Sequence, residues 1–183
     1  MRWLQLALTL LFLPLAACSL NHVTTYPAET HAAYTLDAGD VIAVSVYGDD
    51  TLSKTYKVDE TGTVSLPLIG PIEVRGLTTN AAAASIAAGL AHGFMRNPNV
   101  AVQVDTYRPF FIQGAVKNGG QFPYLPQMTV RSAVSTAGGY SDTAQRTRAT
   151  VYRKQGNQMQ KIGVDLDFPI YPGDTIVIAE RWL

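Results

Sequence analysis

Short apolar segments in which every second residue is β-branched constrain the fold of this chain more than any other feature. In residues 41–47, Ile42, Val44 and Val46 share one face of an extended segment, because successive side chains of a strand point to opposite sides. Residues 100–104 repeat the pattern with three valines. A period of two predicts half-buried strands. Further strands are predicted near residues 149–152, 160–164 and 175–179.

Residues 58–66 predict a strand, a tight turn and a second strand. Gly62 is the predicted structural turn residue, since glycine adopts a positive φ without steric cost. Pro67 and Pro71 have no N–H to donate to a sheet. This segment is therefore predicted to end the strand or to lie at a sheet edge.

A first helix is predicted over residues 80–91, with Thr78 or Thr79 as its N-cap. Alanine dominates this helix, and Ile86 and Leu90 fall on one face. The alanines are there either because alanine is the best helix former or because small side chains admit a close neighbour. The sequence leaves both explanations open.

A second helix is predicted to open at Thr129. Four apolar residues between Val130 and Ala137 form one stripe, and Gly138-Gly139 supplies the stop. Runs of strands with one helix in each half predict an α+β fold of two small strand-rich domains.

A Gly-Asp turn that leads into an apolar strand occurs twice, because residues 36–44 align with residues 170–178. The glycine takes a strained backbone angle, and the carboxylate can accept backbone N–H groups at the turn. The predicted structural turn residues are Gly39, Asp40, Gly173 and Asp174.

The N-terminus is predicted to carry a targeting signal. Residues 1–17 combine a short basic start with an apolar run below the about 20 residues that span a bilayer, which predicts a cleaved signal peptide. Leu15-Ala16-Ala17-Cys18 resembles a bacterial lipobox, so Cys18, the only cysteine, is the predicted lipid attachment site. The alternative is a signal cut elsewhere, which leaves a free thiol. Residues 18–33 show no apolar period and predict a tether.

Charge and residue content exclude several classes of function. The 183 residues carry 14 basic and 14 acidic side chains, so no basic field is available to hold nucleic acid. His22, His31 and His92 lack metal-ligand spacing, and neither a phosphate-binding glycine loop nor a nucleophile motif occurs. Asp49-Asp50 and Asp59-Glu60 are interpreted as solvated turn residues. No catalytic residue, metal site or cofactor is predicted.

Aromatic side chains supply the candidate contacts with sugar. Tyr107 and Tyr124 belong to two aromatic clusters, residues 107–111 and 122–124, whose rings are able to stack on sugar rings. Packing in the core or at an interface is the competing interpretation. The prolines around Tyr124 mark a loop, where binding groups often lie.

The order of these motifs resembles that of bacterial outer-membrane polysaccharide export proteins. Residues 34–48 resemble the opening of the polysaccharide export domain, and residues 58–78 resemble its central signature. Residues 113–122 and 129–139 are similar to a β-grasp soluble-ligand-binding (SLBB) domain. The specific run is the long ordered one, Val58-Asp59-x-x-Gly62-x-Val64-x-Leu66-Pro67-Leu68-Ile69-Gly70-x-Ile72-x-Val74-x-Gly76-Leu77-Thr78.

The resemblance implies four segments: a signal peptide (1–17), a lipid-anchored tether (18–33), a polysaccharide export domain (34–107) and a β-grasp SLBB domain (108–183). It implies an outer-membrane lipoprotein on the periplasmic side that forms a homo-oligomeric ring. This ring is expected to be a conduit for capsular polysaccharide or exopolysaccharide and not an enzyme. The implied partners are the polysaccharide, an inner-membrane polysaccharide copolymerase and, through the lipid, the membrane.

Longer relatives continue past the second Gly-Asp strand into a membrane-crossing amphipathic helix. The sequence is interpreted as a short form that lacks this helix, so either an outer-membrane β-barrel partner completes the path or the acyl chains are the only membrane contact. The alternative function is a monomeric periplasmic lipoprotein that binds carbohydrate or another ligand without a channel. The oligomeric state distinguishes the two hypotheses.

Overall fold

The computed structural model describes residues 33–156 and 158–181. The predicted signal peptide, Cys18 and nearly all of the predicted tether lie outside these residues. The chain divides into two units, residues 1–30 and residues 31–183, and every described element belongs to the second. Buried apolar side chains of this second unit form two separate clusters, one for each half of the described chain. The predicted α+β class with two small strand-rich domains is confirmed.

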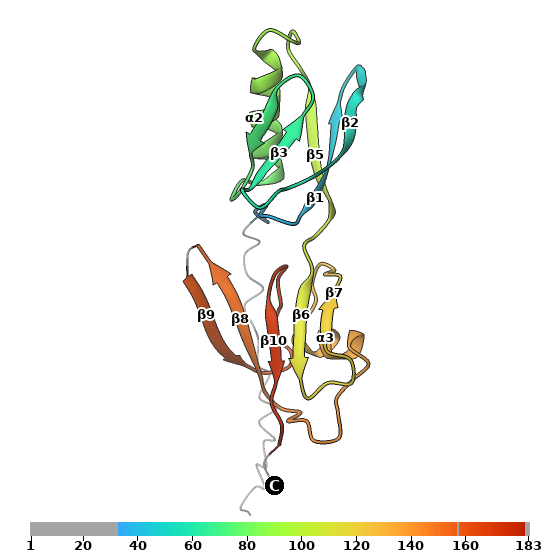
Figure 1. Cartoon of the computed structure of the whole chain (residues 1–183), viewed down its shortest axis with the longest axis vertical. Coiled ribbons are helices and arrows are strands. Elements are labelled where there is room, and N and C mark those ends of the chain that lie inside the picture. Colours follow the sequence, from blue (N-terminus) through green and yellow to red (C-terminus); the bar gives the residue numbers. More distant parts are fainter. Residues whose placement is uncertain (1–32, 157, 182–183) are drawn as a thin grey trace, which may run out of the picture. The chain divides into compact units, whose positions relative to one another are not determined.

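The N-terminal domain holds five strands and one helix (Figure 1). Its elements are β1 (Val41–Val46), β2 (Asp49–Lys57), β3 (Thr63–Leu66), β4 (Gly70–Glu73), α2 (Thr79–Ala91) and β5 (Val100–Thr106). One sheet has the order β2-β1-β5 with β1 antiparallel to both neighbours, and β3 pairs with β4 in a second sheet. Ile42, Val44 and Val46 are buried, as the alternation in the sequence predicts.

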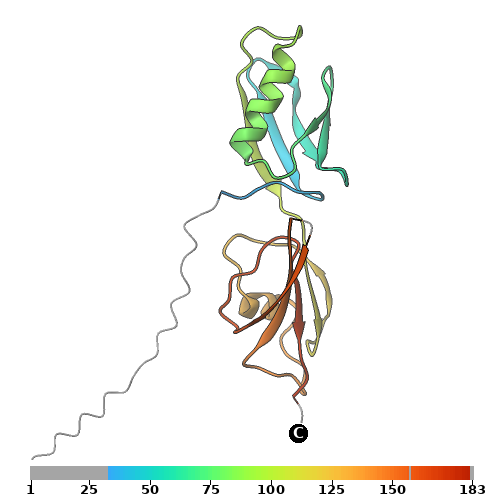
Figure 2. The same ribbon diagram turned by 90° about the vertical axis from the view of Figure 1, so that its left-hand side faces the viewer.

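Helix α2 packs against β5, and Figure 2 shows it lying over the strands of its domain. The Thr78 hydroxyl accepts a hydrogen bond from the Ala81 amide, which identifies Thr78 as the N-cap. Ile86 and Leu90 are fully buried on one face, as predicted. A methyl group added at Gly89 would lie 3.2 Å from a methyl of Ile69, so the helix does approach the β3–β4 turn closely.

Two details predicted for the N-terminal domain are wrong. Asp49 and Asp50 open strand β2 and do not lie in the preceding turn, and the strand before Gly62 ends at Lys57 and does not include Val58. The physical reason for the first error is that the Asp49 carboxylate accepts the amide of residue 51, as a turn aspartate does, while its backbone pairs with β1. In addition, β3 pairs with β4 and not with the strand that precedes the turn.

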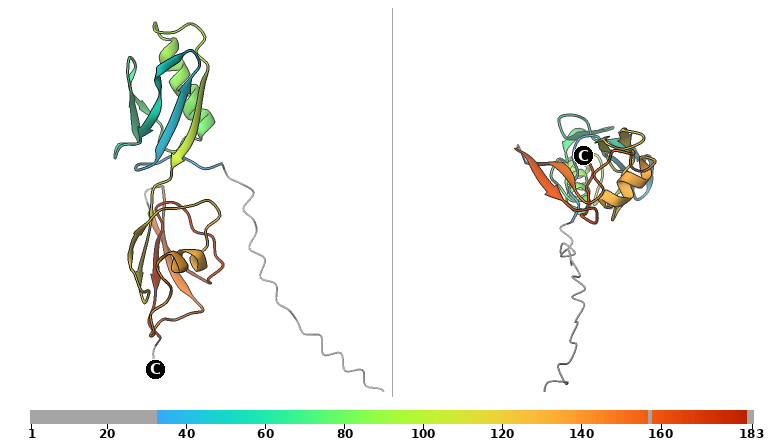
Figure 3. Two further views of the ribbon diagram at one scale, coloured as in Figure 1. Left: turned by 90° about the vertical axis from the view of Figure 1, so that its right-hand side faces the viewer. Right: turned by 90° about the horizontal axis from the view of Figure 1, so that it is seen from below.

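The C-terminal domain is a mixed five-stranded sheet with one helix. Its elements are β6 (Phe110–Gly114), β7 (Gly120–Phe122), α3 (Val130–Thr136), β8 (Ala149–Gln155), β9 (Gln158–Val164) and β10 (Thr175–Ile178). The strand order is β7-β6-β10-β8-β9, with β10 parallel to β6 and antiparallel to β8. Figure 3 shows α3 beside the strands, and its buried side chains belong to the core of this domain.

Helix α3 begins and ends where the sequence predicts. Thr129 and Ser132 form a reciprocal capping box at its start. Gly138 and Gly139, at its end, have φ values of 79° and 92°, and their amides bond to carbonyls of the last helical turn. Among residues 33–156 and 158–181, neither helix is both long and apolar enough to cross a membrane.

Candidate functional site

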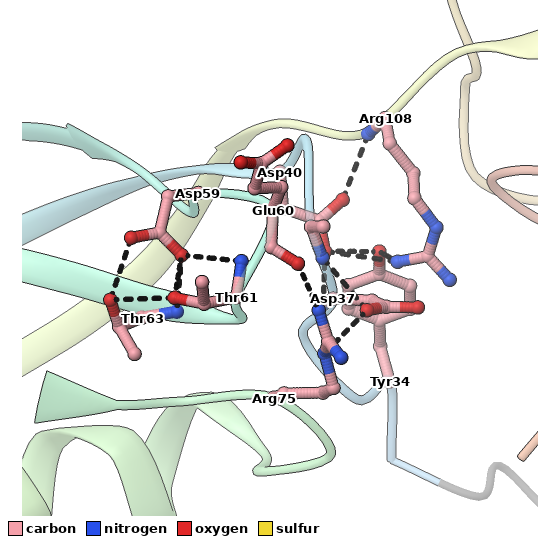
Figure 4. Close-up of polar contacts among 10 residues, drawn as sticks. Tyr34, Asp37, Asp40, Asp59, Glu60, Thr61, Thr63, Arg75 and Arg108 are labelled. Atoms are coloured by element: carbon pink, nitrogen blue, oxygen red, sulfur yellow. Dashed lines mark hydrogen bonds and ion pairs between the residues drawn. The ribbon is translucent and has the colours of Figure 1, made fainter.

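The first Gly-Asp turn buries a carboxylate that is fully hydrogen-bonded. The Asp40 amide donates to the Asp37 carbonyl (3.2 Å), and Gly39 has a φ of 95°. The Asp40 side chain, which is 0% exposed, accepts bonds from the Asp37 amide (2.9 Å) and the Tyr34 hydroxyl (2.7 Å). The Arg108 amide (2.8 Å) and guanidinium (3.1 Å) complete its partners, as Figure 4 shows.

The second Gly-Asp turn repeats this arrangement. The Asp174 amide donates to the Tyr171 carbonyl (3.1 Å), Gly173 has a φ of 86°, and the Tyr171 amide returns a bond to the Asp174 carboxylate (2.8 Å). Asp174 is 1% exposed, and the Arg153 guanidinium donates to both of its oxygens. The Arg153 guanidinium carbon also lies 4.1 Å from the centre of the Tyr171 ring.

Each turn also makes two backbone hydrogen bonds with a neighbouring segment, the first turn with one residue and the second turn with two. The Gly39 amide donates to the Val58 carbonyl (3.0 Å), and the Val58 amide donates to the Asp40 carbonyl (2.8 Å). In the second turn, the Gly173 amide donates to the Pro109 carbonyl (3.0 Å). The Phe111 amide donates to the Asp174 carbonyl (2.8 Å). The sequence echo is thus a repeat of one three-dimensional unit.

Arg108 fills the space that both glycines leave open. A Cβ atom at Gly39 would lie 3.4 Å from the Arg108 Cβ, and a Cβ atom at Gly173 would lie 3.0 Å from the Arg108 Nε. The structure therefore brings the two predicted turns to the same side chain. Sequence reasoning missed this arginine and Arg153.

An aromatic residue six positions before each aspartate was the signal that could have pointed to the arginines. Tyr34 precedes Asp40 and Phe168 precedes Asp174 by the same distance. The Arg108 guanidinium lies 5.7 Å from the Tyr34 ring centre, and the Arg153 guanidinium lies 5.5 Å from the Phe168 ring centre. Extending the aligned segments by two residues would have suggested a cation over each ring.

Gly62, the third predicted turn glycine, has a φ of 84°. Its carbonyl accepts the amides of Val74 and Arg75, and a Cβ atom at Gly62 would lie 2.5 Å from the Arg75 Cβ. Arg75 also donates to the Glu60 carbonyl (2.6 Å) and pairs with Asp37 (3.2 Å; Figure 4). This turn therefore ties the β2–β3 connection to the first Gly-Asp turn.

Of the carboxylates predicted to lie in turns, Asp59 holds the turn before β3 through its hydrogen bonds. Asp59 accepts the backbone amides and the hydroxyls of Thr61 and Thr63 (Figure 4). These hydrogen bonds, that of the Thr61 hydroxyl first, hold the pKa of Asp59 well below its ordinary value. A carboxylate stabilised in its charged form is a poor general acid or base at neutral pH.

Tyr107 and Tyr124, the predicted sugar contacts, lie next to each other. Their ring centres are 5.5 Å apart with planes at 73°, and Tyr34 meets Tyr107 edge to face at 5.0 Å. Burial, and then the hydrogen bond to Asp40, raise the pKa of the Tyr34 hydroxyl far above its ordinary 10.0. A contact of Tyr107 or Tyr124 with sugar stays a prediction.

A hollow of about 460 Å³ lies over the Gly-Asp turns. Its lining includes Arg75, Arg108, Arg153 and Lys154, and the three arginines pair with Asp37, Asp40 and Asp174. The predicted sugar contacts do not line it. Among the described residues, no group of His, Cys, Asp and Glu is suited to a metal ion. The arrangement offers hydrogen bonds to a polar ligand and no activated nucleophile.

Two protein families match adjacent parts of the chain. The polysaccharide biosynthesis/export protein family matches residues 28–105, and the SLBB domain family matches residues 109–163. The chain therefore contains both domains of the resemblance drawn from its motifs. The expectation that the chain is not an enzyme agrees with these matches, which are to a polysaccharide biosynthesis/export family and to the SLBB domain family.

Characterised proteins from two bacteria are similar to the chain. The exopolysaccharide production protein ExoF of Rhizobium meliloti (strain 1021) is 35% identical over 99 residues, which cover 52% of this chain and 24% of ExoF. The polysialic acid transport protein KpsD of Escherichia coli is 25% identical over 159 residues, which cover 81% of this chain and 28% of KpsD. The chain spans about a quarter of the length of these relatives.

Proposed function

We propose that this chain, in which a polysaccharide export domain precedes an SLBB domain, is a lipid-anchored component of a bacterial polysaccharide export system. In this proposal Cys18 carries the lipid, and the protein lies on the periplasmic side of the outer membrane. Copies of the chain form a ring through which capsular polysaccharide or exopolysaccharide leaves the cell. An inner-membrane copolymerase delivers the polymer, and an outer-membrane β-barrel partner completes the path.

The observation that carries this proposal is the order of the two family matches, which follow each other over residues 28–105 and 109–163. Similarity to one exopolysaccharide production protein and one polysialic acid transport protein supports the same class of substrate. The relatives are longer, so the polymer, the ring and the partners are parts of the proposal.

Charge content supports the assembly of several copies. Charged residues make up 15% of the sequence, against about 25% in ordinary soluble domains. A surface with few charges is easier to remove from water, because each buried charge needs a partner. The two Gly-Asp turns serve the fold in this proposal, since hydrogen bonds from the protein occupy both carboxylates.

Deleting the gene and supplying it again on a plasmid tests the export function. We expect the deletion strain to release no polymer into the medium and to accumulate polymer inside the cell envelope, and the plasmid to restore release. The measurement is the polysaccharide content of the medium and of the envelope fraction. Unchanged release from the deletion strain would contradict the proposal.

Light scattering of the purified lipidated protein in detergent tests the ring separately. We expect a single species with the mass of several copies. A species with the mass of one copy would favour the alternative, a monomeric carbohydrate-binding lipoprotein.

A further inference from the structure

The three-stranded sheet of the N-terminal domain has two open edges. Strand β1 lies in the centre, and in the described part of the chain β1 is the only strand bonded to β2 and the only one bonded to β5 within this sheet. An open edge presents unpaired N–H and C=O groups, which makes it a template for another strand.

The residues whose backbone groups face the open edge of β5 can be identified. The Tyr47 amide donates to the Asn99 carbonyl (3.0 Å), so this pair is a hydrogen-bonded pair of the antiparallel ladder. Bonded and non-bonded pairs alternate along such a ladder. Val100, Val102 and Val104 therefore direct their N–H and C=O groups away from β1, toward the open edge.

The same alternation fixes the open edge of β2. Successive residues of β1 point to opposite sides, so Ile42 bonds to β2, where its partner is Tyr56. Thr55 and Lys57, on either side of Tyr56, consequently direct their backbone groups outward.

A hollow of about 740 Å³ runs along the open edge of β5. Six consecutive residues, Pro98–Gln103, line it on the strand side, and Ala83, Ala84 and Ala87 line it on the α2 side. Side chains of consecutive residues lie on opposite faces of a strand, so all six can line one hollow only if it follows the strand edge. An edge strand beside a helix with space between them is the geometry of strand addition.

We propose that β2 of a second copy of this chain occupies the hollow and pairs in parallel with β5. Within one copy, β2 and β5 run in the same direction, because both are antiparallel to β1. A neighbouring copy in the same orientation therefore presents its β2 parallel to β5. Each copy then offers β5 to one neighbour and β2 to the other, which is the head-to-tail contact that generates a ring. The inference rests on the proposed ring and specifies its subunit contact.

The direction of pairing follows from which face each side chain occupies. Val104 directs its backbone outward and its side chain toward the core, while Tyr56 directs its backbone to β1 and its side chain toward the core. In a parallel pair of strands, a residue whose N–H and C=O bond to the partner strand stands opposite a residue whose N–H and C=O point away from that pairing. Val104 therefore fits opposite Tyr56 of the next copy. In an antiparallel pair, residues whose backbone groups point outward would stand opposite each other, for example Val104 and Lys57. Because Val104 is on the core face and Lys57 is on the solvent face, the sheet of one copy would then be turned over relative to the other.

This register also pairs opposite charges. When Val104 stands opposite Tyr56, the next residue, Asp105, comes beside Lys57 of the next copy. Asp105 is the extra residue where the register of β5 shifts, between the pairs Ile42–Val104 and Val41–Thr106, and both Asp105 and Lys57 have exposed side chains within one copy. Opposite charges on adjacent strands stabilise a sheet. The small side chains of α2 leave room for the added strand.

Cysteine cross-linking of the full-length chain tests the contact. We expect K57C/D105C to give a ladder of disulfide-linked multimers after mild oxidation in membranes. K54C/D105C is the matched control, because Lys54 lies on the same strand with its side chain on the other face. Within one copy β1 separates the two positions by about 10 Å, whereas a disulfide needs Cα atoms within about 7 Å. The single variants K57C and D105C show which cross-linked products come from a disulfide with Cys18.

Filling the hollow is the second test. Ala84→Trp places a large side chain in it, whereas Ala88→Trp changes an exposed alanine of the same helix that does not line it. We expect A84W to abolish the multimer seen by light scattering, and A88W to keep it, with unchanged melting temperatures. If the wild type is multimeric, the absence of a K57C/D105C ladder would contradict the β2–β5 contact, and so would a multimer of A84W. Neither result would contradict the proposed ring. A monomeric wild type overturns both.

Discussion

At the scale of single residues, the two Gly-Asp turns depend on side chains that are almost completely removed from water. Asp40 and Asp174 are 0% and 1% exposed, and removing a carboxylate from water costs several kcal/mol unless the charge is paired. Arg108 and Arg153 supply these charges. The Arg108 amide also donates to the Asp40 carboxylate, and the Arg153 guanidinium also donates to the Pro169 carbonyl. Glycine is favoured at positions 39 and 173 because a side chain at either position would contact Arg108.

Gly173→Ala is expected to destabilise the protein more than Gly48→Ala. Both glycines have a φ above 80°, which costs an alanine about 1 kcal/mol or more of the free energy of unfolding. A Cβ at Gly173 would also lie 3.0 Å from the Arg108 Nε, whereas none of the described atoms lies within 4 Å of a Cβ at Gly48. Urea unfolding measures the difference, and equal losses would mean that Arg108 moves away freely.

Tyr34 is expected to make the protein sensitive to alkaline pH. Its pKa is raised in the folded state, so its contribution to stability is complete below pH 10 and is lost as the pH rises above 10, where the unfolded tyrosine ionises. The loss is expected to be up to about 1 kcal/mol per pH unit. Unfolding by urea at pH 9 and pH 11 should show a smaller loss for Tyr34→Phe than for the wild type. Equal losses would show that the Tyr34 hydroxyl titrates normally.

At the scale of secondary-structure elements, both helices could be predicted from the sequence because their signals are local. Thr78 and Thr129 cap the helices through bonds to amides three residues later, and Gly138 ends α3. The burial of Ile86 and Leu90 follows from their spacing alone.

Strand pairing could not be predicted in the same way. Strand β2 carries polar residues on both faces, because much of it is exposed, and strand β7 has only three residues with a glycine among them. These patterns give no period of two. The aromatic residue six positions before each aspartate suggests that a cation is present, but not which one. Arg108 and Arg153 lie 68 and 21 residues from Asp40 and Asp174, and only the folded sheets bring them close.

Thr129→Ala is expected to lower the free energy of unfolding by about 1 kcal/mol. The Thr129 hydroxyl accepts the Ser132 amide, and α3 has only seven residues, so one lost cap is a large share of its stability. Ser135→Ala is the control, since Ser135 is exposed inside the same helix. Thermal unfolding of the two variants checks the expectation, and similar melting temperatures would show that the cap is dispensable.

At the scale of the whole molecule, the proposed attachment to the membrane depends on one residue, Cys18. We expect labelled palmitate to enter the wild type and Ser19→Ala but not Cys18→Ser, because Cys18 is the only cysteine of the chain. Gel autoradiography of labelled cells measures the incorporation. Equal labelling of Cys18→Ser would place the lipid elsewhere.

The place of β10 decides when the C-terminal domain can fold. This strand follows every other strand of its sheet along the chain, yet it lies in the middle, between β6 and β8. A nascent chain that has not yet released Thr175–Ile178 from the ribosome or the translocon therefore leaves β6 and β8 without a common neighbour. Pairing partners so far apart in sequence also slow folding. The sheet of the C-terminal domain therefore cannot be completed until its last strand emerges, which would keep the domain unfolded during the proposed passage across the inner membrane.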